Sequence, residues 1–127
     1  MTQSMKNKEF IIEYFNALSG KEKPDELLNH YIADPALIEH IKFFESAFPK
    51  YKAHLEELIS EGNQLIVRAR LIGVHEGEFG DIPPTHKHVD VPFVVSYIIE
   101  NNKIVSHWLI ADQMVMMEQL GAVGQDA

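Results

Sequence analysis

The sequence predicts one α+β domain, in which N-terminal helices pack on the concave side of a curved, mainly antiparallel sheet. Before about position 50, apolar residues recur at three- and four-residue spacings, whereas the segments after Tyr51 alternate or form β-branched runs. The pairs Gly62-Asn63 and Asn101-Asn102 separate these later segments and favour turns between strands. A chain of 127 residues fits one domain over residues 1–127 with a core of its own. Helices followed by strands indicate a layered α+β fold.

Three helices are expected in the first part of the chain. Residues 4–19 carry one apolar stripe, and Pro24 is well placed in the first turn of a short second helix. Asp34-Pro35 repeats this start signal for residues 36–48, and Pro49 ends the third helix. The apolar positions that define the stripes are Phe10, Ile11, Tyr14, Phe15, Leu18, Leu27, Leu28, Tyr31, Leu37, Ile38, Ile41, Phe44 and Phe48.

Four strands and a last helix are expected after position 50. Residues 51–60 and 64–75 alternate between two faces. Residues 89–100 are apolar on both faces and should form a central strand. A hairpin then leads into a strand over residues 103–111, and residues 113–120 are compatible with a helix.

Composition excludes several classes of protein. Hydrophobic residues make up 46% of the chain and charged residues 24%, as in ordinary globular domains. A net charge of −8 with scattered basic residues argues against a nucleic-acid partner. No apolar run approaches the length that spans a bilayer, so we expect no membrane segment. The chain has no cysteine, which fits a cytoplasmic location and excludes thiol chemistry.

Two passages carry the most specific pattern. Residues 73–87 read GVHEGEFGDIPPTHK, which ends a β-rich run in a loop of glycines and prolines. Residues 103–112 read KIVSHWLIAD, a β-branched strand that ends on an acidic residue before a Met-rich helix. Gln119-Leu120-Gly121 follows at the end of that helix.

This ordered set resembles the signature of the SnoaL-like polyketide (ester) cyclases over residues 45–121. The family pattern reads approximately GTHxGEFxGIPPTGK, then GKIVExWxxxD, then QLG. Here Val74 replaces the Thr, His86 replaces the Gly of PPTGK, and Ser106 occupies the Glu-type position. The resemblance implies the cone-shaped α+β barrel of the nuclear-transport-factor type. It also implies cofactor-independent acid/base chemistry, with no metal, on an apolar molecule that bears a carbonyl.

Asp112 is the residue that matches the catalytic acid/base of these cyclases. A carboxylate among apolar walls has its charged form disfavoured and becomes a better base. We therefore expect Asp112 at the inner end of an apolar pocket, near His75, His107 or Arg68. The alternative interpretation is that Asp112 caps the last helix, which is common for Asp between a strand and a helix.

His107 and His75 are the candidates to assist Asp112. In strict alternation His107 faces away from the side that Asp112, Trp108 and Ser106 share, so a His107–Asp112 pair would need a bulge. His107 could equally be a half-buried residue of the sheet. His75 lies on the apolar face of its strand, where it could bind a substrate oxygen or be a hydrogen-bonded core histidine.

Aromatic and apolar residues around this pattern are expected to line the pocket, and Arg68 could bind an anionic group of the substrate. The alternative for Arg68 is ion pairing on the sheet with nearby glutamates. His75, His86 and His88 lie close in sequence, but no third ligand has a spacing typical of zinc, so we expect no metal site. The expected substrate-binding residues are Arg68, Trp108, Phe44, Phe48, Phe79, Ile82 and Phe93.

Three functions remain open from the sequence. The leading one is a SnoaL-like cyclase, followed by an isomerase, dehydratase or epoxide hydrolase on the same scaffold that uses the same base. The third is a small-ligand-binding module without turnover. In each case we expect a homodimer, because the strand at 89–99 is apolar on both sides and only one side can fill the cone.

Overall fold

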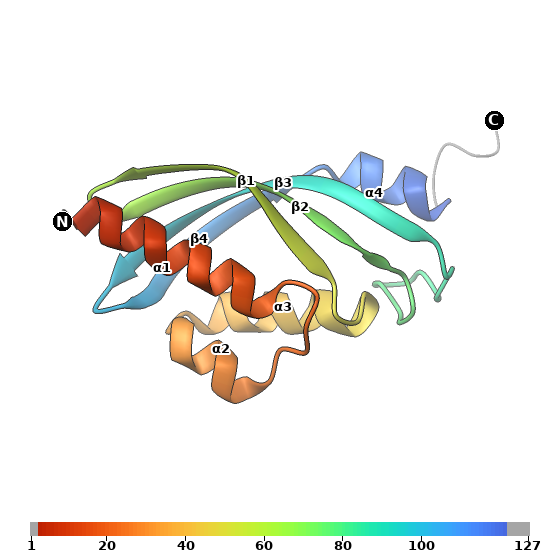
Figure 1. The fold of residues 1–127 in the computed structure, drawn as a ribbon. Helices are drawn as coiled ribbons and strands as arrows, with labels where there is room; N and C mark the ends of the chain where they lie inside the picture. Colours follow the sequence, from red (N-terminus) through yellow and green to blue (C-terminus); the bar gives the residue numbers. More distant parts are fainter. Residues whose placement is uncertain (1–2, 122–127) are drawn as a thin grey trace.

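The computed structural model describes residues 3–121 and confirms the predicted α+β fold. Three helices precede a four-stranded sheet, and a fourth helix follows it (Figure 1). The elements are α1 (Gln3–Leu18), α2 (Asp25–Tyr31), α3 (Pro35–Ala47), β1 (Lys52–Glu61), β2 (Gln64–Val74), β3 (His88–Glu100), β4 (Lys103–Ala111) and α4 (Gln113–Leu120).

The sheet is fully antiparallel, and its strands lie in the order β1-β2-β3-β4. It curves over α1, α2 and α3, which lie on its concave side, while α4 lies beside the first part of β3 (Figure 1). Two-residue turns join β1 to β2 and β3 to β4, and a longer loop over residues 75–87 joins β2 to β3, so that consecutive strands lie side by side throughout. The curvature leaves room between the sheet and the helices for a core and a pocket.

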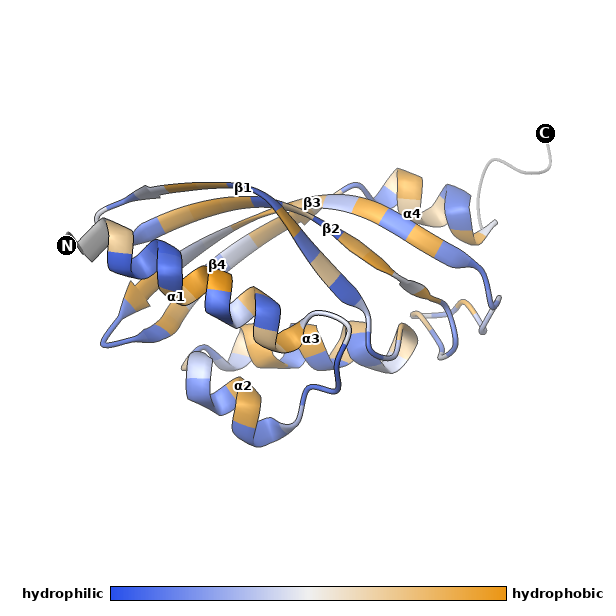
Figure 2. Ribbon diagram, viewed as in Figure 1, coloured by the Kyte–Doolittle hydropathy of each residue, from blue (hydrophilic) through white to orange (hydrophobic). Residues whose placement is uncertain are grey.

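The main core fills the space between the helices and the inner face of the sheet. Along β2, Leu65, Val67 and Ala69 are fully buried, and they alternate with exposed residues. The same alternation is visible as hydrophobic and hydrophilic bands along the strands (Figure 2). From the helices, Ile11 and Leu28 are fully buried against this face. The apolar faces of the helices and of the strands therefore pack together in one layer, as expected for amphipathic helices on a sheet with one apolar face.

Two bulges interrupt the alternation and decide which side chains face inward. In β1, pairing passes from Leu55–Ala69 directly to Glu57–Arg68, so Glu56 is an extra residue. In β4, pairing passes from Ser106–Ile98 to Ile104–Ile99, so Val105 is the extra residue. A bulge places residues of unlike parity on the same face. Ile104 and His107 consequently both reach the interior side of β4, although three positions separate them.

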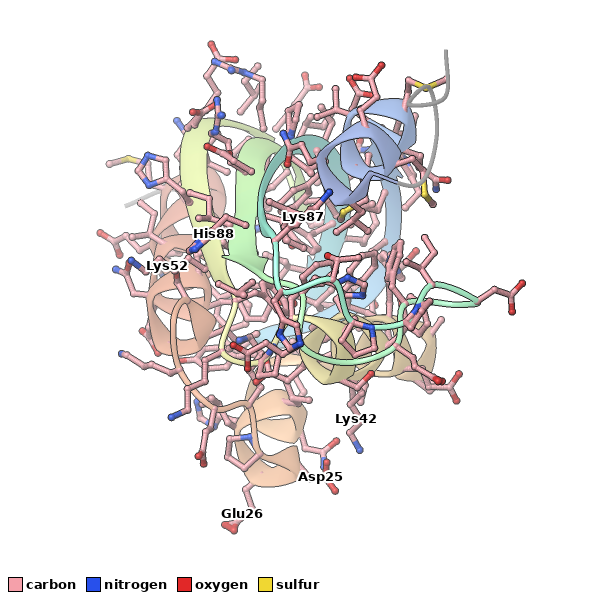
Figure 3. All side chains as sticks on the ribbon, turned by 90° about the vertical axis from the view of Figure 1, so that its right-hand side faces the viewer. Asp25, Glu26, Lys42, Lys52, Lys87 and His88 are labelled. Atoms are coloured by element: carbon pink, nitrogen blue, oxygen red, sulfur yellow. The ribbon has the colours of Figure 1, made fainter. Side chains whose placement is uncertain are left out.

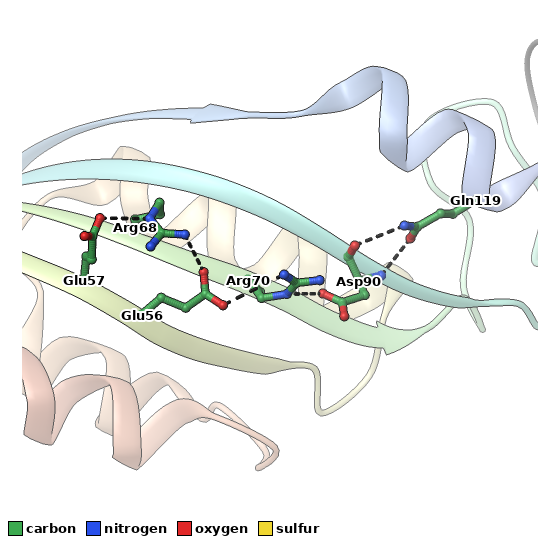
Figure 4. Close-up of polar contacts among 6 residues, drawn as sticks. All are labelled: Glu56, Glu57, Arg68, Arg70, Asp90 and Gln119. Atoms are coloured by element: carbon green, nitrogen blue, oxygen red, sulfur yellow. Dashed lines mark hydrogen bonds and ion pairs between the residues drawn. The ribbon is translucent and has the colours of Figure 1, made fainter.

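The outer face of the sheet carries a network of charged side chains (Figure 4). Arg68 pairs with both Glu57 and Glu56, at 2.9 Å each, because the bulge turns these adjacent glutamates to one face. Arg70 Nε lies 2.6 Å from Asp90 Oδ1 on the neighbouring strand.

The same network reaches the last helix. The backbone N–H of Asp90 donates to Gln119 Oε1 at 2.7 Å, and Gln119 Nε2 donates to the Asp90 carbonyl at 3.0 Å. This reciprocal pair of hydrogen bonds holds α4 against β3.

Two ion pairs hold α2 and its preceding linker against α3. Asp25 and Lys42 point toward one another from α2 and α3, with 2.6 Å between Oδ1 and Nζ (Figure 3). Both are exposed, so this pair contributes little stability. Lys23 is buried instead, and its Nζ lies 2.8 Å from Glu45 Oε1 and 4.0 Å from the centre of the Tyr51 ring. Lys23 therefore joins the linker, the end of α3 and the start of β1 at one point.

Within residues 3–121, no helix combines the length and the apolar character needed to cross a membrane.

A band of apolar side chains remains uncovered on the outer face. Ile59, Ile66 and Trp108 lie in one row across the sheet, in register with Ser96, and Ile110 lies in the next row. Trp108 is 48% exposed and Ile59 and Ile110 are each 66% exposed. An apolar band of this kind beside charged residues is typical of a protein–protein contact.

We predict that two copies of the chain associate through this band. Trp108→Glu places a charge at its centre and should convert the dimer to a monomer, because a charge buried in an apolar contact is strongly disfavoured. Light scattering coupled to gel filtration measures the mass, and circular dichroism checks that the fold is kept. Ile12→Glu, at an exposed apolar position on α1, is the matched control and should remain dimeric. A parent protein that is monomeric at micromolar concentration would contradict the prediction.

Candidate active site

A pocket with an almost wholly apolar lining lies between α1, α3 and the inner face of the sheet. Helix α3 supplies Leu37, His40, Ile41 and Phe44, which are spaced so that they share one helix face. The sheet contributes apolar residues from β1 to β4, and α4 contributes Met116. Both the predicted substrate-binding residues Phe44 and Phe93 line this pocket. Such a concave apolar site with few polar groups is typical of small-molecule binding.

His40 is the only imidazole that lines the pocket among the described residues. It is half-buried on α3, and its ring is 4.8 Å from that of Phe44. Burial, together with the neighbouring His107, lowers the pKa of His40 below its ordinary value of 6.5. The ring is therefore neutral near neutral pH and has a free nitrogen lone pair that can accept a proton.

Behind His40 lies a paired histidine and aspartate. The ring centres of His40 and His107 are 6.3 Å apart, and His107 Nδ1 lies 2.8 Å from Asp34 Oδ2. Both members of the pair are mostly buried, with 11% and 14% of their side chains exposed. A carboxylate only accepts hydrogen bonds, so His107 Nδ1 carries a proton and its Nε2 is oriented away from Asp34.

The start of α3 explains why Asp34 is held in this place. Asp34 is the N-cap of the helix, and its Oδ1 accepts a hydrogen bond from the backbone N–H of Ala36 at 3.0 Å. The other carboxylate oxygen is free to bind His107 on β4. One side chain thus begins the helix and orients the histidine. Among the described residues, no set of three or more His, Cys, Asp and Glu side chains is placed to hold a metal ion.

Asp112 does not lie in the pocket, so its expected location is wrong. It is exposed and is the N-cap of α4, where Oδ1 accepts from the backbone N–H of Val115 at 3.1 Å. Its neighbour Ala111 lines the pocket, and because successive residues of a strand face opposite sides, Asp112 points outward. None of His75, His107 and Arg68 forms the expected polar contact with it.

Arg68 and Trp108 are also outside the pocket, contrary to the expectation that they line it. Both lie on the outer face of the sheet, where Arg68 is occupied by Glu56 and Glu57 and Trp108 is half-exposed. The ion-pairing alternative for Arg68 is therefore confirmed. The physical cause is the period of two along β2 and β4, which sends these side chains to the face opposite His107.

His75 belongs to a second apolar cluster rather than to the pocket. It is fully buried, its Nδ1 accepts from the backbone N–H of Thr85 at 3.1 Å, and its ring is 5.4 Å from that of Phe48. Its Nε2 has no hydrogen-bond partner among the described residues. The interpretation of His75 as a core histidine fits these contacts.

Phe48, Phe79 and Ile82 lie in this second cluster too. Phe48 is fully buried, and Phe79 and Ile82 exchange two backbone hydrogen bonds of 3.0 Å across the tip of the loop. The side chains of both pack inward against the cluster, and the ring of Phe79 lies 5.7 Å from that of Phe44. The loop thus covers the end of α3 and supports one wall of the pocket through Phe44.

The sequence interpretation missed Asp34 as a partner of His107, and it missed His40 and the pocket tyrosines. One signal for His40 was present, since it interrupts the apolar stripe of α3 between Leu37 and Ile41. A polar residue on a buried helix face usually has a structural partner or a function. The partnership of Asp34 and His107 has no local signal, because 73 positions separate the two residues.

The family model for SnoaL-like polyketide cyclases matches residues 31–120. The chain therefore belongs to the SnoaL-like polyketide cyclase family. No curated protein matches it in sequence.

Solved structures support the same fold. A protein from Jannaschia sp. CCS1, assigned to the SnoaL-like polyketide cyclases, is 19% identical with a TM-score of 0.83, and the match covers 98% of each chain. AclR from Streptomyces galilaeus, assigned as a hydroxylase, is 18% identical with a TM-score of 0.83 and covers 97% of this chain and 85% of its own. A SnoaL-like polyketide cyclase from Agrobacterium tumefaciens is 19% identical with a TM-score of 0.75 and covers 91% and 98%. At such identities the likeness concerns the fold alone.

We predict that Asp112 stabilises the protein through its cap. Asp112→Ala removes the acceptor for Val115 and should lower the free energy of unfolding by about 1 kcal/mol, whereas Asp112→Asn keeps an oxygen there and should lower it by a few tenths. Urea denaturation of the three proteins measures the difference. Equal stability of the parent and Asp112→Ala would show that the cap is dispensable.

We also predict that His75 makes stability fall at mildly acidic pH. Burial is the main cause that lowers the pKa of His75; the nearby Gly77 backbone opposes this effect and His86 adds to it. The unfolded chain takes up its proton near pH 6.5, whereas the folded chain does so only at lower pH. The unfolded state then binds more protons, so the free energy of unfolding decreases as the pH falls through this window. An NMR titration of the His75 ring should give a pKa below 6.5; a higher value would refute this account.

Proposed function

We propose that this protein is a cofactor-independent acid/base enzyme of the cyclase type that acts on a small, mostly apolar molecule bearing a carbonyl. The observation that carries the proposal is the position of His40 in an apolar pocket, with the His107–Asp34 pair directly behind it. Membership of the SnoaL-like family supports the reaction class.

His40 is the base in this proposal. Its neutral imidazole removes a proton from the carbon next to the substrate carbonyl, and the electrons of the broken C–H bond form an enolate. The enolate carbon then attacks a second carbonyl of the same molecule and forms a C–C bond. The resulting alkoxide takes the proton back from the imidazolium, so the enzyme returns to its starting state and no redox partner is needed.

The His107–Asp34 pair tunes this base. His107 contributes to the lowered pKa of His40 and so helps to keep it neutral before the reaction, while Asp34 orients the His107 ring. The apolar walls contribute by excluding water, which keeps His40 neutral before the reaction.

We predict that the protein accelerates the exchange of the acidic C–H protons of 2-tetralone for deuterium in heavy water, which NMR measures directly. His40→Asn should lower the rate by about 100-fold or more, as expected for loss of a general base. Asp34→Asn keeps the oxygen that caps α3 but removes the charge, and should lower the rate without unfolding the protein. His54→Asn is the matched control, because His54 is exposed on β1, and it should leave the rate unchanged.

Asp112→Asn separates this mechanism from the one that the family pattern suggests. If His40 is the base, Asp112→Asn exchanges the protons as fast as the parent. A large loss of rate in Asp112→Asn with full activity in His40→Asn would return the catalytic role to Asp112. A parent protein no faster than free imidazole at the same concentration would argue for a binding module without turnover.

A further inference from the structure

The polar groups of the pocket, apart from His40, are tyrosine hydroxyls. Three of the four tyrosines of the chain line it, namely Tyr14, Tyr51 and Tyr97. They come from α1, from the residue before β1 and from β3, so the fold gathers them from distant parts of the sequence. All three are buried, whereas most of the surrounding wall is aliphatic or phenylalanine.

Two of these tyrosines pack against each other. Tyr14 and Tyr97 meet edge to face with 5.9 Å between ring centres. Within residues 3–121, no side chain or backbone group gives the Tyr51 hydroxyl a hydrogen bond. Its ring is held in place by Lys23, whose Nζ lies 4.0 Å from the ring centre.

A count of protons shows what this cluster can do. Even when the Tyr14 and Tyr97 hydroxyls bind each other, only one of their two protons is used, so the pair keeps at least one proton to donate. Tyr51 supplies another. Burial raises the pKa of all three tyrosines above the ordinary value of 10.0, so each remains protonated at neutral pH. A ligand oxygen at this place can accept a hydrogen bond from one of these hydroxyls.

The surroundings also specify the kind of oxygen. No arginine or lysine lines the pocket in the described part of the chain, so a carboxylate or phosphate would lose its hydration without gaining a counter-charge. Lys23, which contacts the Tyr51 ring, is occupied by Glu45 and by the carbonyl oxygens of Lys21 and Tyr51. A neutral acceptor on an apolar frame fits such a site best.

We propose that Tyr51 and the Tyr14–Tyr97 pair form a donor site for one neutral carbonyl oxygen of the ligand. The inference rests on the proposed function in taking this pocket as the ligand site, and it adds the group that the pocket recognises. A carbonyl held there is polarised, and the same hydroxyls stabilise the enolate oxygen that forms when the adjacent C–H bond is broken.

The experiment compares acetophenone with α-methylstyrene, which has the same shape but carries C=CH2 in place of C=O. Binding to the parent and to single Tyr→Phe variants is measured by calorimetry or by NMR titration. Tyr51→Phe and Tyr97→Phe should each weaken the binding of acetophenone about threefold to tenfold, the usual effect of one neutral hydrogen bond. The affinity for α-methylstyrene should not fall. Tyr31→Phe is the matched control, since its hydroxyl donates to Glu13 outside the pocket.

A spectroscopic measurement distinguishes a direct hydrogen bond to the ligand carbonyl from a change in the shape of the pocket. The C=O stretching band of bound acetophenone should lie at lower frequency in the parent than in Tyr51→Phe, because a hydrogen bond weakens the C=O bond. If both Tyr→Phe variants weaken the two ligands equally, or weaken neither, the donor site is refuted while the pocket remains a ligand site. If neither ligand binds the parent, both this inference and the proposed function fail. If the donor site behaves as expected but the protein does not accelerate proton exchange, only the proposed role of His40 as a base is refuted.

Discussion

The register between β3 and β4 is the constraint on which the rest of the site depends. It places Tyr97 opposite His107 on the inner face and Ser96 opposite Trp108 on the outer face. A slip of one residue would exchange the faces, bringing Trp108 and Ile110 inward and His107 and Leu109 outward. The extra residue Val105 keeps this register compatible with a buried Ile104, which anchors the start of the strand against Ile32. The bulge thus lets one short strand serve both the core and the site.

Helix α3 is the second element that the site requires, and Asp34 fixes it in two ways. As the N-cap it determines where the helix begins, and as the partner of His107 it ties that beginning to β4. The face of α3 that carries Leu37, His40, Ile41 and Phe44 is thereby directed at the pocket. Loop residue Phe79 supports the far end of the same helix through contacts with Phe44 and Phe48. The orientation of His40 therefore follows from contacts at both ends of its helix.

The pocket separates two kinds of polar group by their environment. His40 lies beside another histidine and is kept neutral, whereas the tyrosines lie deeper and are kept protonated. Burial disfavours the charged form of both groups. It therefore lowers the pKa of the imidazole, whose charged form is protonated, and raises the pKa of the phenols, whose charged form is deprotonated. The same apolar pocket therefore supplies a neutral proton acceptor and neutral proton donors. This is the arrangement that proton transfer next to a carbonyl requires.

The sequence by itself determined the layers of this fold and the family. Apolar periodicities are local, so the change of period near Tyr51, the Asp34-Pro35 start and the hairpin pairs could be interpreted without coordinates. It also contained the correct alternative for Asp112 and Arg68, since a cap and a sheet ion pair depend on neighbours close in sequence or register. Only the tertiary structure decided which residues share the pocket. Asp34 and His107, like Tyr14 and Tyr97, lie close together because the sheet curves over the helices. The face on which each strand residue lies depends on bulges that no local sequence pattern predicts.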